Sequence, residues 1–214
     1  MTTRAEIVSR LLDPGIIPVV RANKAAHVMP ACEALVAGGM TTLEITMTTP
    51  DALACIREAS HRFAKQVMVG VGTVMTADMG RAAIEAGASF VVTPIMRPEI
   101  VQMAHAANCA VILGAFTPTE AQLAYEAGAD LIKIFPADRP GFIKAILAPM
   151  PHLKIIPTSG VNLQNGPEFF AVGCAAIGVA TSLVSPKILR EENWAELARL
   201  AAEYVAMARK APRK

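Results

Sequence analysis

The sequence predicts an α/β protein, a (β/α)8 TIM barrel with an additional helix at its N-terminus. Eight short apolar runs alternate with longer amphipathic segments along the 214 residues. Several amphipathic segments end at a glycine, and a short connection then leads into the next apolar run. Eight strand–helix repeats of this kind are typical of a TIM barrel. No linker or low-complexity segment interrupts the series, so we expect a single domain over residues 1–214.

Hydrophobic periodicity defines the elements in chain order. The chain begins with an amphipathic pattern that indicates a helix rather than a signal peptide. The predicted strands are Ile16–Val20, Thr42–Thr46, Val67–Gly70, Phe90–Thr93, Ala110–Gly114, Leu131–Phe135, Lys154–Pro157 and Ala175–Val179. Helical patterns cover Lys24–Ala37 and roughly Asp51–Ala64. Glycine just past a helix is the expected C-cap, and such stops fall at Gly38-Gly39, Gly87-Ala88, Gly128-Ala129 and Gly173-Cys174.

A doubly wound open sheet is the alternative fold. The number of repeats favours the barrel, and no G-x-G-x-x-G follows the first strand, as a dinucleotide-binding domain would require. The segment Gly70-Val71-Gly72-Thr73 is too short to be a dinucleotide loop, and we interpret it as a glycine turn.

Composition excludes several classes of function. The net charge of +2 is too small to indicate binding to nucleic acid or to an anionic membrane. The longest uncharged stretches are interrupted by glycine, proline and polar residues, so no transmembrane span is expected. The four cysteines have no C-x-x-C spacing and lie in apolar surroundings, which predicts buried reduced thiols and a cytoplasmic protein.

Lys133 is the strongest candidate for a catalytic residue. Side chains alternate along a strand, so Ile132 and Ile134 are expected to face the helices, while Leu131, Lys133 and Phe135 face the barrel interior. Burial disfavours the charged form of an amine, and an uncharged lysine is a nucleophile toward carbonyl groups. The structural alternative is a lysine that extends to the rim and pairs with a carboxylate.

Glu44 is the matching acidic residue. Leu43 and Ile45 are expected to face the helices, which directs Glu44 and Thr46 inward. Alternate strands of a TIM barrel contribute to the same interior layer, so Glu44 on the second strand and Lys133 on the sixth are expected at similar heights. Schiff-base chemistry requires both an amine and a proton carrier. A buried ion pair without chemistry is the alternative, although such pairs stabilise proteins poorly.

Two loops rich in small residues suggest an anion site. TIM barrels often bind phosphate at the loops after strands seven and eight, which here read Pro157-Thr158-Ser159-Gly160-Val161 and Gly178-Val179-Ala180-Thr181-Ser182. A short helix beginning near Thr181 would add its positive end. Arg21 at the end of the first strand suits a substrate carboxylate, and Thr73 after the third strand could bind the same group.

Metal chemistry is not expected. His27, His61 and His105 fall in helical segments and His152 falls in a loop. No set of histidine and acidic residues has metal-ligand spacing at the strand ends, and no G-x-S-x-G motif is present.

The motifs together resemble one family, the 2-keto-3-deoxy-6-phosphogluconate (KDPG) aldolases, which includes 4-hydroxy-2-oxoglutarate (KHG) aldolase activity. The segments that carry the resemblance run in order over nearly the whole chain. They are Pro18-Val19-Val20-Arg21, Leu43-Glu44-Ile45-Thr46, Gly70-Val71-Gly72-Thr73, Thr93-Pro94, Lys133-Ile134-Phe135-Pro136-Ala137 and Pro157-Thr158-Ser159-Gly160-Val161. The resemblance implies a (β/α)8 barrel, usually a homotrimer, that needs no metal or other cofactor.

The resemblance also implies the roles of individual residues. Lys133 would form the Schiff base and Glu44 would carry protons. Arg21 and Thr73 would hold the pyruvate carboxylate, and Pro94 and Phe135 would line the pocket. The phosphate would lie between Ser159-Gly160 and Ala180-Thr181.

The chain departs from the family pattern near the implied phosphate site. Some relatives have arginine where this chain has Thr48, and Arg21 matches the other branch. Many relatives have Gly-Gly at Ser159-Gly160 and Gly-Ser at Ala180-Thr181. Three hypotheses follow: an aldolase for KDPG, an aldolase for an unphosphorylated 2-oxo acid such as KHG, and a non-catalytic barrel that binds sugar phosphates.

Overall fold

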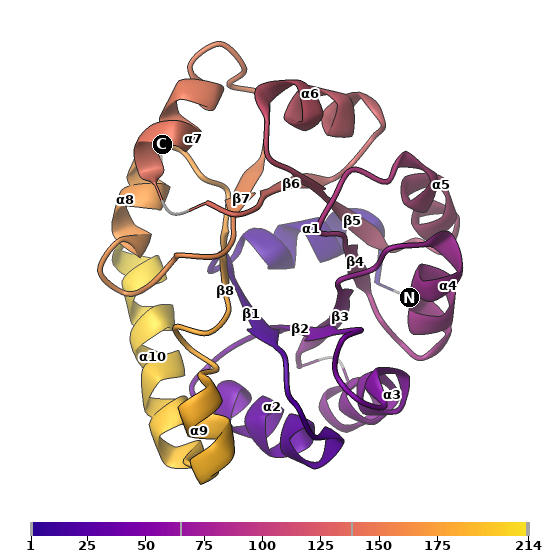
Figure 1. Cartoon of the computed structure of the whole chain (residues 1–214), viewed down its shortest axis with the longest axis vertical. Coiled ribbons are helices and arrows are strands. Elements are labelled where there is room, and N and C mark those ends of the chain that lie inside the picture. The colour runs from indigo at the N-terminus through magenta and orange to yellow at the C-terminus, as the bar shows by residue number, and fades with distance from the viewer. Residues whose placement is uncertain (1, 65, 138, 213–214) are drawn as a thin grey trace.

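A nearly closed barrel of eight parallel strands forms the centre of the molecule (Figure 1). The computed structural model describes residues 2–64, 66–137 and 139–212. The strands are β1 (Ile16–Val20), β2 (Thr42–Thr46), β3 (Met68–Gly72), β4 (Phe90–Val92), β5 (Ala110–Ala115), β6 (Leu131–Ile134), β7 (Ile155–Pro157) and β8 (Ile177–Val179). Their order, β7-β6-β5-β4-β3-β2-β1-β8, places each strand beside its neighbours in the sequence. The TIM-barrel prediction is therefore confirmed.

The barrel closes between β7 and β8. Thr158, just after β7, forms a parallel bridge with Gly178 of β8. Just before β8, the Ala175 N–H donates to the Ile155 carbonyl at 2.9 Å. A Cβ at Gly178 would overlap the Thr158 hydroxyl, so the absence of a side chain there lets the last two strands meet.

Helices surround the barrel on its outer face and cover one of its ends. They are α1 (Arg4–Leu12), η1 (Ala25–His27), α2 (Val28–Ala37), α3 (Ala52–Phe63), α4 (Ala77–Glu85), α5 (Pro98–Ala106), α6 (Pro118–Glu126), α7 (Pro140–Leu147), α8 (Gly166–Ala171), α9 (Pro186–Glu191) and α10 (Trp194–Lys210). The predicted glycine stops are confirmed at Gly39, Gly87, Gly128 and Gly173, whose φ angles are positive. Positive φ is accessible to glycine at little steric cost.

The strands separate two apolar clusters, as the alternation of side chains predicts. The outer cluster joins barrel and helices and contains Leu43, Ile45, Ile132 and Ile134. The inner cluster fills the barrel. Its strand residues are Ile17, Met68, Phe90, Val92, Ala110, Ile112, Leu131 and Ile156, and Ala176 joins them just before β8. The predicted outward faces of β2 and β6 are thereby confirmed, and so is the inward direction of Leu131 on β6. Glu44 and Lys133, the charged residues that interrupt the apolar sequences of β2 and β6, are both buried.

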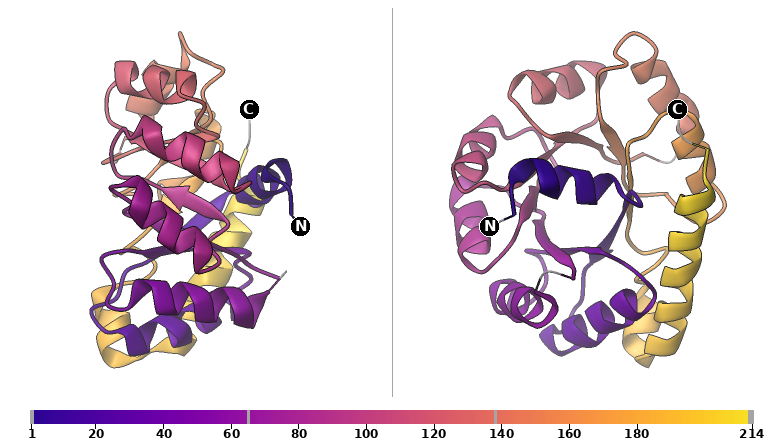
Figure 2. Two further views of the ribbon diagram at one scale, coloured as in Figure 1. Left: turned by 90° about the vertical axis from the view of Figure 1, so that its right-hand side faces the viewer. Right: turned by 180° about the vertical axis from the view of Figure 1, so that it is seen from behind.

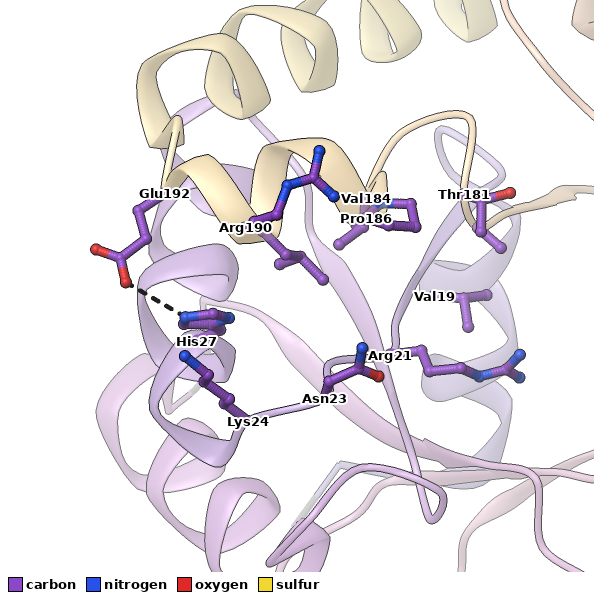
Figure 3. A pocket seen from close by; sticks show the side chains of 12 residues that line it. Val19, Arg21, Asn23, Lys24, His27, Thr181, Val184, Pro186, Arg190 and Glu192 are labelled. Carbon is purple, nitrogen blue, oxygen red and sulfur yellow. Dashed lines mark ion pairs between the residues drawn. The ribbon is translucent and has the colours of Figure 1, made fainter.

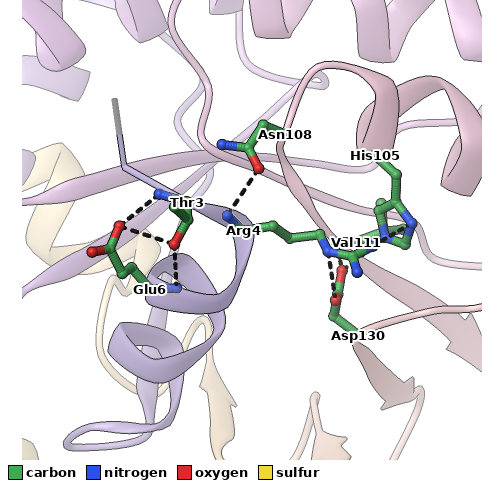
Figure 4. A network of polar contacts seen from close by, with 7 residues as sticks. All are labelled: Thr3, Arg4, Glu6, His105, Asn108, Val111 and Asp130. Carbon is green, nitrogen blue, oxygen red and sulfur yellow. Dashed lines mark hydrogen bonds and ion pairs between the residues drawn. The ribbon is translucent and has the colours of Figure 1, made fainter.

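The N-terminal helix α1 closes one end of the barrel. Figure 2 shows it lying across the end opposite to the viewer of Figure 1. Ile7 and Leu11 of this helix belong to the inner cluster. A polar network fixes its first turn (Figure 4), where Arg4 lies 3.6 Å from Asp130 and its N–H donates to the Asn108 side chain at 3.0 Å. The other end of the barrel is left for the loops that follow the strands.

Some predicted boundaries are wrong. The interpretation of Gly70–Thr73 as a turn fails because β3 continues through Gly72, which pairs with Thr46 of β2. Glycine has a low strand propensity, and the adjacent strand supplies the pairing that overrides it. The eighth strand begins at Ile177 rather than Ala175. The predicted domain also includes residues 1, 65, 138, 213 and 214, which lie outside the described residues. Within the described chain, no helix is long and apolar enough to cross a bilayer.

Candidate active site

A cleft of about 330 Å³ opens at the end of the barrel opposite to α1. Residues from the ends of four strands and from the loops that follow them line it. They are Val19, Arg21, Lys133, Phe135, Thr158, Ser159, Gly160, Val161, Asn162, Ala180, Thr181 and Ser182. Seven of the ten predicted site residues are therefore together: Arg21, Lys133, Phe135, Ser159, Gly160, Ala180 and Thr181. TIM-barrel enzymes have their active sites at this face.

Lys133 extends from β6 into the cleft. Lys133 is only 7% exposed, and its Nζ lies 5.5 Å from the centre of the Phe135 ring. Within the described chain it makes no ion pair with a carboxylate, so the alternative of a rim lysine held by an acidic partner does not apply. The amine is thus available to a carbonyl group that enters the cleft.

Glu44 is a buried residue of β2 that does not itself line the cleft. It is 3% exposed, and its Oε1 atom has no hydrogen-bond partner within the described chain. Burial raises the pKa of Glu44, while the positive charges of Lys133 and Arg21 act in the opposite direction. Both cations therefore lie close enough to act on this carboxylate. An unpaired buried carboxylate costs free energy, which is typical of a group kept for a reaction.

Gly72 of β3 makes room for the Glu44 carboxylate. A Cβ at position 72 would overlap the carboxylate, with Glu44 Cδ at 2.6 Å. Glu44 itself pairs with Val19 on β1 and with Gly70 on β3. The glycine predicted as part of a turn therefore serves as a close-contact position beside the candidate acid.

Arg21 follows β1 directly and is exposed at the cleft. The next residue is anchored, since the Ala22 N–H donates to the Thr49 hydroxyl at 3.3 Å. Thr49 and Thr48 each contact the Thr46 hydroxyl, at 3.3 and 3.0 Å. The threonine cluster after β2 thus holds the backbone beside Arg21, and Thr48 belongs to this cluster.

Three further predicted site residues, Thr73, Pro94 and Phe135, follow the ends of strands at the face of the barrel where the cleft opens. Thr73 follows β3 with φ of 60° and is half-buried, and it does not line the cleft. Pro94 follows β4 and also lies outside the lining, packed so closely on Gly114 that a Cβ there would overlap it. Phe135 was expected to face the barrel interior, but it follows the end of β6 and is 40% exposed at the mouth.

Backbone N–H groups gather where the anion site was predicted. Those of Gly160, Val161, Thr181 and Ser182 donate to no other group within the described chain. Side chains hold the carbonyl sides of the first loop: Asn165 donates to the Gly160 carbonyl at 2.8 Å, and Ser182 donates to the Val161 carbonyl at 2.6 Å. Free N–H groups on two adjacent loops are suited to bind an anion.

The predicted helix near Thr181 is wrong. The chain forms a single turn there, in which the Ala180 carbonyl accepts from Leu183 at 3.0 Å and from Val184 at 2.9 Å. The helix α9 begins at Pro186, capped by the Ser185 side chain. Proline is favoured in the first turn of a helix, so the helix begins at Pro186, after the loop that contains Thr181.

Several residues that line the cleft were not predicted: Val19, Thr158, Val161, Asn162 and Ser182. Thr158, Val161 and Ser182 lie in the two loops already identified, so loop membership would have found them. Val19 lies on the same face of the first strand as Arg21, so alternation would have found it, whereas Asn162 carries no comparable signal. Within the described residues, no group of three or more histidine, cysteine or acidic side chains could hold a metal ion. The four cysteines are free and buried, as predicted.

Known proteins of similar sequence and structure fit this geometry. The family model "Aldolase: KDPG and KHG aldolase" matches residues 7–200. A 2-dehydro-3-deoxy-phosphogluconate aldolase of Haemophilus influenzae is 31% identical over 95% of this chain and 97% of its own, and one of Pseudomonas aeruginosa is 34% identical over 94% and 92%. A crystal structure of KDPG aldolase from Legionella pneumophila, with pyruvate captured at low pH as a covalent carbinolamine intermediate, superposes with a TM-score of 0.84. It is 26% identical and covers 94% of this chain and 97% of its own.

Proposed function

The chain belongs to the KDPG and KHG aldolase family, and from this premise we propose that it cleaves KDPG to pyruvate and glyceraldehyde 3-phosphate. Lys133 is the proposed Schiff-base lysine and Glu44 the proposed proton carrier. One observation carries this assignment. A buried lysine reaches the cleft near a buried carboxylate whose Oε1 has no partner within the described chain.

The proposed reaction begins with attack of Lys133 Nζ on the C2 ketone. Glu44 supplies the proton with which the C2 oxygen leaves as water, and a protonated imine forms. Glu44 then accepts the C4 hydroxyl proton, through a bound water, and the C3–C4 bond breaks. Its electron pair moves into the imine, which becomes an enamine. Protonation of the enamine at C3 and hydrolysis of the imine release pyruvate and free Lys133.

The remaining predicted residues receive binding roles in this proposal. Arg21 pairs with the substrate carboxylate, where a guanidinium can donate two parallel hydrogen bonds, and Thr73 assists it. Pro94 and Phe135 bound the pocket. The phosphate accepts from the free N–H groups around Ser159-Gly160 and Ala180-Thr181. No cofactor is required, because the protonated imine is the electron acceptor.

The test is mass spectrometry after incubation with pyruvate and borohydride. We expect a reduced adduct on Lys133 that is absent from Lys133→Ala and retained in Lys144→Ala, which changes an exposed lysine on α7. Absence of an adduct from the unmodified protein at a large excess of pyruvate would contradict the aldolase assignment. Sugar-phosphate binding without an adduct would support the non-catalytic barrel.

KHG is the second candidate substrate, and the residues Ser159 and Ala180 favour it. Ser159 has φ of 73°, and Ser159 and Ala180 each carry a Cβ atom at a position where many relatives have glycine. Comparison of kcat/KM for KDPG and KHG decides between the substrates. Equal values would count against a working phosphate site, whereas a large preference for KDPG would support it.

We also propose a homotrimer in the cytoplasm. Phe116 and Phe142 are 51% and 37% exposed, and their ring centres lie 5.8 Å apart. Exposed aromatic clusters often belong to subunit interfaces. The free buried thiols are consistent with a reducing compartment. Sedimentation equilibrium should give the mass of three chains, and a monomer mass at micromolar concentration would exclude the trimer.

A further inference from the structure

A second cavity, of about 380 Å³, lies beside the cleft between the loop after β1 and the helix α9. Its lining residues are Val19, Arg21, Asn23, Lys24, His27, Ala180, Thr181, Val184, Pro186, Leu189, Arg190 and Glu192. In Figure 3, Arg21 and Thr181 lie at one end, the ion pair of His27 with Glu192 lies at the other, and Arg190 lies between them. The volume is in the range of small-molecule sites.

The second cavity and the cleft adjoin each other. They share Val19, Arg21, Ala180 and Thr181. A substrate bonded to Lys133 that is long enough to pass the turn at Ala180 can therefore place its far end on either side of this turn. One side holds the free N–H groups described above. The other side is the second cavity, whose chemistry differs.

The second cavity carries two further cations, Lys24 and Arg190, that do not line the cleft. Arg21, Lys24 and Arg190 form no ion pair with any carboxylate that the structure describes. The single carboxylate of the lining, Glu192, lies 3.3 Å from His27. An anion between Lys24 and Arg190 would thus meet two cations without displacing an existing partner.

Apolar side chains form the α9 side of this cavity, and the polar side chain of Asn23 lies on the side of the loop after β1. Val184 and Leu189 are buried side chains of the lining, and Pro186 between them has no backbone N–H. Hydroxyl groups of a sugar chain packed against Val184, Pro186 and Leu189 would be left without partners, and that is costly. A hydrocarbon chain of several carbons fits these side chains better, with an anionic group at its far end.

We propose that this cavity is an acceptor-side subsite for aliphatic aldehydes that carry a terminal carboxylate. This inference rests on the proposed aldolase function. In the condensation direction, the enamine of pyruvate and Lys133 attacks the aldehyde carbon, and a C–C bond forms between them. The aldehyde oxygen takes up a proton and becomes a C4 hydroxyl. Water then hydrolyses the imine, which releases a 4-hydroxy-2-oxo dicarboxylic acid and balances the water lost when pyruvate bound.

The carboxylate would accept from Arg190, whose planar guanidinium matches its two oxygens, and would lie near the Lys24 ammonium. The hydrocarbon chain would cover Val184 and Leu189. The ion pair of His27 with Glu192 bounds the outer end, and the negative charge of Glu192 keeps the carboxylate on the Arg190 side. Lys24 and Arg190 are specificity residues in this proposal and have no contact with the reacting atoms.

The experiment measures kcat/KM for three aldehydes at saturating pyruvate: 6-oxohexanoate, hexanal and glyceraldehyde 3-phosphate. The variants are Arg190→Leu and Lys24→Leu. The matched control is Lys187→Leu, which changes an exposed lysine of α9 outside the cavity lining. All four proteins are also tested for the borohydride-trapped pyruvate adduct on Lys133, a measurement that does not involve the second cavity.

We expect 6-oxohexanoate to be preferred over hexanal, and Arg190→Leu and Lys24→Leu each to lower kcat/KM for 6-oxohexanoate about tenfold, as the loss of a charged hydrogen bond does. Values for hexanal and glyceraldehyde 3-phosphate should stay within about twofold. Equal kcat/KM values for 6-oxohexanoate and hexanal would overturn the subsite, and so would a loss in Lys187→Leu as large as in the two cavity variants. In either case the trapped adduct would still support the aldolase assignment. Absence of the adduct from the unmodified protein would overturn both.

Discussion

At the scale of the residue, Glu44 combines burial with an oxygen atom that has no partner within the described chain. We predict that Glu44→Gln lowers kcat/KM for the cleavage reaction by about 10²- to 10⁴-fold, the usual contribution of a general acid or base. The control is Glu85→Gln, at an exposed position of α4. Steady-state kinetics of pyruvate release measures the effect. A loss below threefold would remove Glu44 from the mechanism.

The same substitution should stabilise the fold in a manner that depends on pH. Burial raises the pKa of Glu44, so the native state binds the proton more tightly than the unfolded chain. The Glu44 carboxyl therefore stabilises the native state below its ordinary pKa of about 4.3, and this stabilisation is lost as the pH rises through the raised pKa. Glu44→Gln should therefore gain about 1–3 kcal/mol of unfolding free energy at pH 8, and less at pH 5. Urea denaturation at pH 5 and pH 8 measures this gain in unfolding free energy. The same gain at both pH values would contradict a raised pKa of Glu44.

At the scale of the element, the register of β2 against β3 decides where the Glu44 carboxylate lies. Gly72 is the position that a side chain would make incompatible with it. We predict that Gly72→Ala displaces the carboxylate and lowers kcat/KM at least tenfold, because catalytic groups tolerate displacements of well under 1 Å. Circular dichroism should show that the fold is kept.

Gly80→Ala is the matched control for this element. A Cβ at Gly80 of α4 would lie 2.5 Å from Met103 Cε, the flexible end of a side chain that can move aside. Both variants add one methyl group to a buried glycine, but only one of them is next to Glu44. Similar losses of activity in both would indicate a general packing effect rather than displacement of the acid.

At the scale of the whole molecule, α1 separates the interior of the barrel from solvent at the end away from the cleft. Leu11 is fully buried in the inner cluster. We predict that Leu11→Ala costs about 2–5 kcal/mol of unfolding free energy, as large-to-small core substitutions do. Leu12→Ala, at a half-buried position of the same helix, should cost less. Chemical denaturation measures both.

This substitution should leave the chemistry unchanged at 25 °C, because α1 and the cleft lie at opposite ends of the barrel. The borohydride-trapped adduct on Lys133 should form in Leu11→Ala as it does in the unmodified chain. Loss of the adduct under conditions where the variant is folded would show that the two ends are coupled. An unfolding free energy equal to that of the unmodified chain would show that α1 contributes little to the core.

Local pattern was enough to predict most of the fold. The strands Ile16–Val20 and Thr42–Thr46 have the predicted bounds, because a buried parallel strand is a short apolar run with defined ends. The inward directions of Glu44 and Lys133 follow from alternation within one strand. Glycine stops follow from the φ angles that helix ends require. Each of these properties depends on residues within a few positions of one another.

The sequence by itself thus determined the barrel, the two inward charged residues and the loops with small side chains. Only the tertiary structure decided that Gly72 accommodates Glu44, that α1 fills the end of the barrel, and that Lys24 and Arg190 line the same second cavity. It also decided that the chain at Thr181 forms a turn rather than the start of a helix. The turn at Thr181 is a local feature, with hydrogen bonds from Leu183 and Val184 to Ala180. The other three could not be predicted because each joins segments far apart in the sequence, whose distance in space depends on closure of the whole barrel.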